Sequence, residues 1–144
     1  MKIRDLMTSP VIHIEKDESV SVAARTLEHY NIGALPVCGR DGRLCGLVTD
    51  RDIVIRCLAA EQRPDQTTVG QVMTGRVQTA APDMEVSEAA KLMGTKQIRR
   101  LPVVENGKVC GMISLGDLAT AWENSGADQA LSQISSPFGG EKSF

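Results

Sequence analysis

The chain has 144 residues, of which 42% are hydrophobic and 24% charged, an ordinary balance for one globular domain or two very small ones. Its formal charge of −2 and isoelectric point of about 5.7 argue against a protein held to nucleic acid by phosphate contacts. No apolar run reaches the roughly 18 residues of a transmembrane helix, and the start lacks the apolar stretch of a signal peptide. We therefore expect a cytoplasmic protein with no membrane or nucleic-acid partner.

An internal repeat is the most informative feature of the sequence. A shift of 66 positions, which becomes 65 after the 38–41 turn, superimposes like residues in one order: Met7-Thr8 on Met73-Thr74, Leu35–Val37 on Leu101–Val103, Cys45-Gly46 on Cys110-Gly111, and Asp52 on Asp117. Chance would hardly preserve this order across both halves. We expect one repeat over residues 1–66 and a second over 67–124, followed by a short helix and a flexible tail over 125–144.

Hydrophobic spacing predicts the same order of elements in both repeats. In the first repeat they are a strand at Val11–Ile14, a helix at Ser19–Tyr30, strands at Leu35–Cys38 and Leu44–Val48, and a helix at Thr49–Leu58. In the second they are a strand at Val77–Thr79, a helix at Glu85–Gln97, a hairpin turning at Asn106-Gly107, and a helix at Ser114–Trp122, with a further short helix around Ala127–Ile134. The fold class is thus α/β (α+β), with two β-α-β-β-α repeats. Because about 60 residues bury little surface alone, we expect the repeats to pack with pseudo-twofold symmetry.

The order of elements and several sequence segments resemble the CBS (cystathionine β-synthase) domain pair, also called a Bateman module, in a stand-alone bacterial form. The segments that carry the resemblance are Asp5–Thr8, Ile32–Val37 and Gly46–Ile53 in the first repeat, and Val72–Thr74, Ile98–Val103 and Gly111–Leu118 in the second. The resemblance implies a regulatory module, such as an energy sensor, with two clefts between the repeats. Such clefts hold adenosyl ligands (AMP, ADP, ATP, S-adenosylmethionine, NAD or cyclic di-AMP), no cofactor is required, and a homodimer that signals to an unknown effector protein is expected.

Two Ser/Thr-x-x-Asp patterns, Thr49 to Asp52 and Ser114 to Asp117, each follow an apolar strand and open a helix. In the family the carboxylate accepts hydrogen bonds from ribose hydroxyls, and the Ser or Thr hydroxyl reaches ribose or phosphate. A vicinal diol offers two donors, which suit the two carboxylate oxygens. The same pattern is a helix capping box, although that motif usually ends in the longer Glu. The presence of Asp in both repeats favours ligand contact, and the two roles are compatible.

The resemblance also implies a pocket for the adenine base. It is formed by the segment after Met-Thr and by the turn before the Pro-containing strand. Its predicted residues are Thr8, Ile12, Ile32, Gly33 and Ala34 in one half, and Thr74, Gln78, Ile98 and the backbone at Arg99 and Arg100 in the other. Small residues let a flat base approach the backbone. Gly33 is equally explained as a turn residue, and Gln78 can simply face water.

A pair of arginines, Arg99 and Arg100, stands where the first repeat has Gly33-Ala34. Related nucleotide-sensing pairs place a basic residue at the Arg100 position against phosphate, so Arg100 is the phosphate candidate and Arg99 its weaker neighbour. The alternatives are two solvated arginines or a salt bridge to Asp117. Arg51 could reach phosphate, but pairing with one of the aspartates beside it is favoured.

No Ser-His-Asp set, metal-ligand cluster or Gly-rich phosphate loop is present, so we expect no enzyme and no metal site. Cys38 and Cys45 flank one hairpin, where a disulfide, metal site or redox switch is conceivable, but small buried thiols are favoured. Two alternatives to a ligand sensor remain open. One is a ligand-free interaction or oligomerisation module, and the other is a thiol redox or metal sensor acting through Cys38 and Cys45.

Overall fold

The computed structural model describes residues 1–121, so the predicted helix around Ala127–Ile134, the tail at 125–144 and the helix end at Trp122 lie outside the described residues. The described chain forms two compact units. The first-repeat unit contains residues 12–77 together with 107–109. The second-repeat unit contains residues 1–11, 78–106 and the described part of 110–144.

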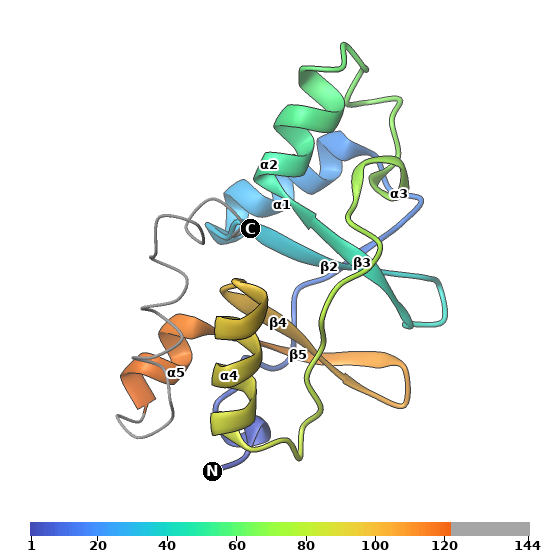
Figure 1. Cartoon of the computed structure of the whole chain (residues 1–144). Helices are drawn as coiled ribbons and strands as arrows, with labels where there is room; N and C mark the ends of the chain where they lie inside the picture. Colours follow the sequence, from blue (N-terminus) through green and yellow to red (C-terminus); the bar gives the residue numbers. More distant parts are fainter. Residues whose placement is uncertain (122–144) are drawn as a thin grey trace. The chain divides into compact units, whose positions relative to one another are not determined.

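The first-repeat unit is built on a three-stranded sheet. Strand β1 (Ile14–Glu15) runs parallel to β2 (Ala34–Cys38), which pairs antiparallel with β3 (Leu44–Thr49). The helices are α1 (Val20–Tyr30), α2 (Asp50–Ile53), its π-helical continuation η2 (Val54–Leu58), and α3 (Val69–Val72). Figure 1 shows α1 and α2 side by side. Aliphatic side chains from the three strands and from α1, α2 and α3 form the core.

The ends of α1 explain why this segment is helical. The Ser19 side chain accepts a hydrogen bond from the Val22 N–H, which caps the first turn. Asn31 adopts a left-handed conformation, with φ of 54°, and ends the helix. Between them Val20, Ala23 and Leu27 are buried at helical spacing. The helix predicted at Ser19–Tyr30 is confirmed, with Ser19 as its cap.

The second-repeat unit contains η1 (Ile3–Asp5), α4 (Val86–Lys96), α5 (Leu115–Ala121) and a β4–β5 hairpin (Arg100–Glu105 and Lys108–Ser114), except for residues 107–109, which are grouped with the first-repeat unit. Asn106 and Gly107 both have positive φ, 54° and 80°, as a tight hairpin turn requires. The strand expected near Val77–Thr79 is reduced to a single parallel bridge between Ala80 and Val103. The strand predicted at Val11–Ile14 lies instead at Ile14–Glu15, and the predicted order of elements is otherwise confirmed in both repeats.

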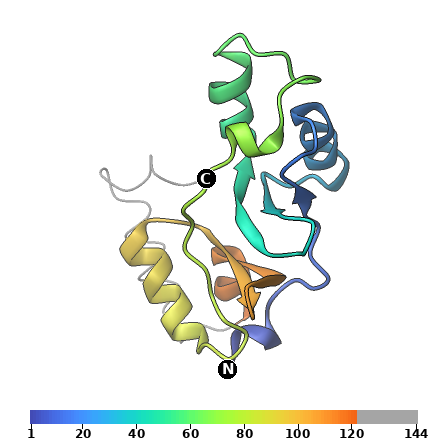
Figure 2. The ribbon, with the colours of Figure 1, turned by 90° about the vertical axis from the view of Figure 1, so that its right-hand side faces the viewer.

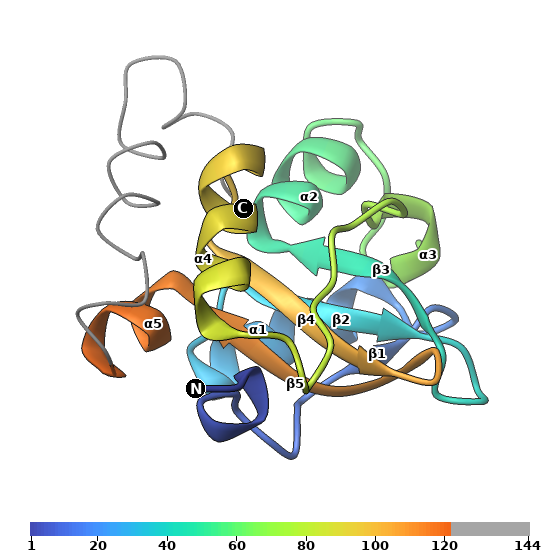
Figure 3. The same cartoon turned by 60° about the horizontal axis from the view of Figure 1, so that its bottom comes forward.

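Each compact unit includes the leading segment of the other repeat. Thr8 forms an antiparallel bridge with Met112 on β5, and Thr74 forms the equivalent bridge with Leu47 on β3. Figure 2 shows the blue N-terminal segment beside the orange hairpin of its unit, and Figure 3 shows α3 beside β3. The leading segments of the two repeats therefore belong to the cores that they contact, with Ile3 in one core and Val69 in the other.

The short helices η1 and α3 in these leading segments were not predicted. Thr68 and Gln71 form a capping box at α3, with the Gln71 side chain accepting the Thr68 N–H at 2.8 Å. This Thr-x-x-Gln pattern is the sequence signal that could have revealed α3. Within residues 1–121, none of the helices combines the length and hydrophobicity that crossing a membrane demands.

Candidate ligand-binding site

Thr49 and Asp52 lie at the junction between β3 and α2. The Thr49 N–H donates to Oδ2 of Asp52 at 3.0 Å, and the Asp52 N–H donates to Oγ1 of Thr49 at 3.0 Å. Both residues are buried, with 3% and 8% exposure. The capping box is therefore complete with Asp, and the argument that Asp rather than Glu disfavours capping is wrong. What remains for other partners is the second carboxylate oxygen, Oδ1.

Oδ1 of Asp52 faces groups from two other segments. The Thr74 hydroxyl donates to it at 3.5 Å, the long limit of a hydrogen bond, and Nη1 of Arg56 lies 3.9 Å away. The Asp50 N–H at the same junction donates to the Gly33 carbonyl at 3.1 Å. The structure thus brings four predicted residues, Gly33, Thr49, Asp52 and Thr74, together within the first-repeat unit. Arg56 is a fifth group that the sequence analysis missed.

The second-repeat unit repeats this arrangement at the junction between β5 and α5. The Ser114 N–H donates to Oδ2 of Asp117 at 2.8 Å, and the Asp117 N–H donates to Oγ of Ser114 at 3.1 Å. The Leu115 N–H donates to the Arg99 carbonyl at 2.7 Å, which ties the turn before β4 to the helix start. Thr8 bridges Met112, two residues before Ser114 on the same strand. The unit therefore gathers Thr8, the Arg99 backbone, Ser114 and Asp117.

The remaining predicted residues differ in burial and in their place along the chain. Ala34 and Ile98 are buried at 8% and 7% exposure, whereas Ile32 is 39% and Ile12 37% exposed. In the first repeat, Ile12 precedes β1, and Ile32 and Ala34 flank Gly33. In the second repeat, exposed Gln78 precedes the Ala80 bridge, Ile98 follows α4, and half-buried Arg100 begins β4. The first-repeat unit holds Ile12, Ile32 and Ala34, and the second holds the other three.

The basic residue beside Asp52 is Arg56 rather than Arg51. The Arg51 N–H donates to the side chain of Asp50 at 2.8 Å, and no ion pair of its guanidinium is found within residues 1–121. The spacing of four residues between Asp52 and Arg56 on a helix places the two side chains on one face. That spacing is the sequence signal that could have identified Arg56.

The cysteine thiols are unpaired. Cys38 is buried and Cys45 half-buried, and neither forms a disulfide in the structure. Burial, followed by the nearby Cys45 and Asp41, raises the pKa of the Cys38 thiol to about 11. A thiol with such a pKa is protonated and unreactive at neutral pH. Among the described residues, no group of three or more His, Cys, Asp or Glu side chains could hold a metal ion.

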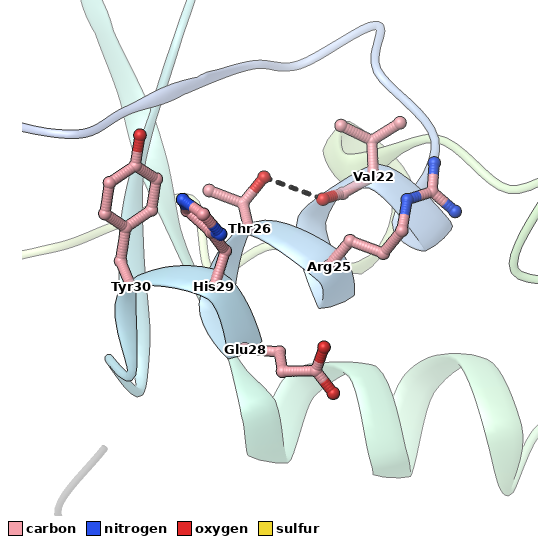
Figure 4. A pocket seen from close by; sticks show the side chains of 6 residues that line it. All are labelled: Val22, Arg25, Thr26, Glu28, His29 and Tyr30. Carbon is pink, nitrogen blue, oxygen red and sulfur yellow. Dashed lines mark hydrogen bonds between the residues drawn. The ribbon is translucent and has the colours of Figure 1, made fainter.

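A shallow hollow of about 430 Å³ lies along α1 (Figure 4). Its walls are the side chains of one helix: Val22, Arg25, Thr26, Glu28, His29 and Tyr30. The Thr26 hydroxyl donates to the Val22 carbonyl at 2.8 Å, and the rings of His29 and Tyr30 meet edge to face. None of the predicted ligand-binding residues lines this hollow, so it is separate from the two strand–helix junctions.

A family model for the CBS domain matches residues 3–58 and 69–124. The CBS domain-containing protein YhcV of Bacillus subtilis is 38% identical over 134 residues, which cover 92% of this chain and 94% of that protein. Hypoxic response protein 1 of Mycobacterium tuberculosis is 34% identical over 134 residues, covering 93% and 94% of the two chains.

Two solved structures are also similar. The crystal structure of Hypoxic Response Protein I with two coordinated zinc ions has a TM-score of 0.79 and 34% identity, covering 85% of this chain and 99% of that one. The CBS domain pair of protein MJ0100, in complex with 5′-methylthioadenosine and S-adenosyl-L-methionine, has a TM-score of 0.74 and 30% identity, covering 83% and 94%. Both similarities extend over most of the chain.

Proposed function

The chain belongs to the CBS domain family, and we propose that it is a non-catalytic regulatory sensor whose ligand contains an adenosyl group. In this proposal the ribose of the ligand is held by a carboxylate at a strand–helix junction, Asp52 in one site and Asp117 in the other. The signal is a change in the packing or docking of the protein when the ligand binds, since a ligand shifts an equilibrium by its different affinity for two states.

The observation that carries the proposal is the repeated junction geometry. Each Asp uses one carboxylate oxygen, Oδ2, in its capping box. The other oxygen, Oδ1, can accept a hydrogen bond from a ribose hydroxyl, which in Asp52 competes with the long contact from the Thr74 hydroxyl. Asp52 is buried, and a buried acceptor gains more from such a donor than an exposed one. The complex of the MJ0100 domain pair with two adenosyl compounds supports the same ligand class for a chain 30% identical to this one.

The rest of the proposed site follows the sequence analysis. Thr49 and Ser114 offer hydroxyls next to the carboxylates, and Arg100 is the proposed phosphate contact. The base is proposed to contact a set of small, apolar and polar residues near the two junctions: Thr8, Ile12, Ile32, Gly33, Ala34, Thr74, Gln78, Ile98 and Arg99.

The test is a ligand screen followed by matched variants. Thermal shift with AMP, ATP, NAD, S-adenosylmethionine and 5′-methylthioadenosine should give at least one increase in Tm, because a ligand that binds only the folded state raises stability. Calorimetry then gives the affinity and the number of sites. Asp52→Asn and Asp117→Asn keep an amide oxygen for the capping box but remove the charge. Each should weaken binding at its own site by about tenfold.

The matched control is Asp50→Asn, which removes a neighbouring exposed carboxylate on the same helix. It should leave affinity unchanged. A lack of response to every ligand at millimolar concentration would favour a ligand-free interaction module instead. Native affinity in both Asp52→Asn and Asp117→Asn would show that the ligand binds elsewhere.

We also propose that the protein forms a homodimer. Three large apolar side chains, Val54, Ile55 and Leu58, are 51%, 49% and 55% exposed on η2. Such side chains on one short helical segment are typical of a contact surface. Light scattering should give twice the chain mass for the native protein, and Ile55→Glu should shift it to the monomer. A native protein that is monomeric at high concentration would refute the dimer.

A further inference from the structure

The Arg56 side chain connects the Asp52 junction to the leading segment of the second repeat. Its Nη1 donates to the carbonyl oxygens of Val72 at 3.1 Å and Met73 at 2.9 Å. The same nitrogen lies 3.9 Å from Oδ1 of Asp52. One guanidinium therefore contacts both the carboxylate and two carbonyls that lie 16 and 17 residues further along the chain.

The segment that Arg56 holds is also bound to β3. The Leu47 N–H donates to the Thr74 carbonyl at 3.0 Å, and the Thr74 N–H donates to the Leu47 carbonyl at 2.8 Å. The Thr74 hydroxyl in turn reaches Oδ1 of Asp52. Oδ1 is thus the point where the segment Val72–Thr74, the Arg56 guanidinium and the Asp52 carboxylate meet.

A ligand hydroxyl that takes Oδ1 has to compete with these contacts. Oδ2 is already used by the capping box, and Asp52 is only 8% exposed, so there is little room for an additional donor. The Thr74 contact is long, and Arg56 is half-exposed, so both partners can yield. Occupation of Oδ1 and attachment of Val72–Thr74 are then linked and oppose each other.

We infer that Arg56 is a positioning residue that holds Val72–Thr74, in the leading segment of the second repeat, against Asp52, and that a ligand on Oδ1 of Asp52 loosens this segment. The ligand-dependent half of the inference rests on the proposed function, whereas the positioning role of Arg56 does not. The signal of the first-repeat site thus leaves through the leading segment of the second repeat.

The second repeat differs at the equivalent position. The repeat offset places Ala121 where the first repeat has Arg56, so this position carries no arginine. Thr8 and Met112 nevertheless form the same bridge that Thr74 and Leu47 form in the first repeat, with N–H to carbonyl distances of 2.8 and 3.2 Å. The chain therefore contains an internal control for any effect assigned to Arg56.

Hydrogen exchange without ligand tests the positioning role. In Arg56→Met, the amides of Leu47 and Thr74 should exchange about tenfold faster, because contacts to a charged donor are lost. The amides of Thr8 and Met112 should keep their native rates. Arg56→Lys, which retains the charge but not the planar fork, should restore part of the protection. Unchanged Leu47 and Thr74 rates, or an equal increase at all four amides, would overturn the role.

Binding of 5′-methylthioadenosine tests the coupling, and this neutral probe avoids direct charge attraction to Arg56. Calorimetry should show severalfold tighter binding in Arg56→Met, since a competitor for Oδ1 is removed, whereas a merely structural role would weaken binding. In the native protein the bound probe should speed exchange at Leu47 and Thr74. If the probe binds but affinity falls or exchange slows, the coupling is overturned and the proposed function stands. If no adenosyl compound binds, the proposed function and the coupling both fail, and the ligand-free exchange still decides the role of Arg56.

Discussion

Replacement of Gly46 by alanine should detach Met73-Thr74, in the leading segment of the second repeat, from β3. A Cβ at this position would lie 2.3 Å from the Thr74 carbonyl oxygen and 3.1 Å from Sδ of Met73. The backbone of Thr74 would have to move by about 1 Å to reach an ordinary contact, which breaks the two hydrogen bonds of the Leu47–Thr74 bridge. Each bond contributes about 1 kcal/mol to stability. Alanine offsets part of this loss, because it lowers the entropy of the unfolded chain and so stabilises the folded state by about 0.4–1 kcal/mol.

The net loss for Gly46→Ala is therefore about 1–2 kcal/mol, measured as the change in the free energy of unfolding by urea titration. Gly111→Ala is the matched control in the second repeat. There the closest atom is Sδ of Met7 at 2.7 Å, the flexible end of a side chain, and the Thr8 carbonyl oxygen lies at 3.0 Å. A rotated Met7 accommodates most of the new methyl group, so this loss should stay below about 1 kcal/mol. Equal stability losses in the two variants, or a larger one in Gly111→Ala, would refute the reasoning.

Three further outcomes are expected. Leu35→Ala removes a fully buried side chain and should lower the free energy of unfolding in urea by about 2–5 kcal/mol. Burial raises the pKa of Cys38 to about 11, so iodoacetamide at pH 8 should label Cys45 first. Because the pKa of Cys38 in the folded state exceeds the usual 9.0, the free energy of unfolding should fall as pH rises from 9 towards 11, and it should fall less in Cys38→Ala. Lys2 hydrogen-bonds Glu85 at 2.7 Å and holds the pKa of that carboxyl below its usual range. The ionised Glu85 therefore stabilises the fold above about pH 4.5, and this stabilisation is lost on acidification. In Glu85→Gln, the corresponding decrease in the free energy of unfolding at acid pH should be absent.

Local patterns predicted the elements of the fold that depend on neighbouring residues. Ser19 as a cap, the Asn106-Gly107 turn and the two Ser/Thr-x-x-Asp helix starts are determined by bonds within a few residues, and the structure places them as expected. The single-residue change of offset near Cys38 coincides with a register shift in the β2–β3 pair. Such features leave a direct trace in the sequence.

The contacts that the sequence did not reveal join distant segments. Arg56 reaches carbonyls 16 and 17 residues away, and carbonyl oxygens are the same in every residue type, so no side-chain pattern marks them. The docking of Thr8 on Met112 joins residues from opposite repeats, which the internal repeat alone does not indicate. The first strand of the second repeat shrank to the Ala80 bridge although the hydrophobic pattern at Val77–Thr79 resembled a short strand.

The placing of each leading segment on the other repeat's strand makes neither repeat self-sufficient. A lone copy of residues 67–124 would expose the edge of β5 where Thr8 binds, and would carry a Met73-Thr74 stretch with no strand to receive it. Two identical copies would remedy both defects by trading these stretches, as in a domain-swapped pair. In the tandem chain the two repeats exchange their leading segments within a single polypeptide. Proteolysis near residue 66 should therefore leave two fragments that fold well only when they are mixed.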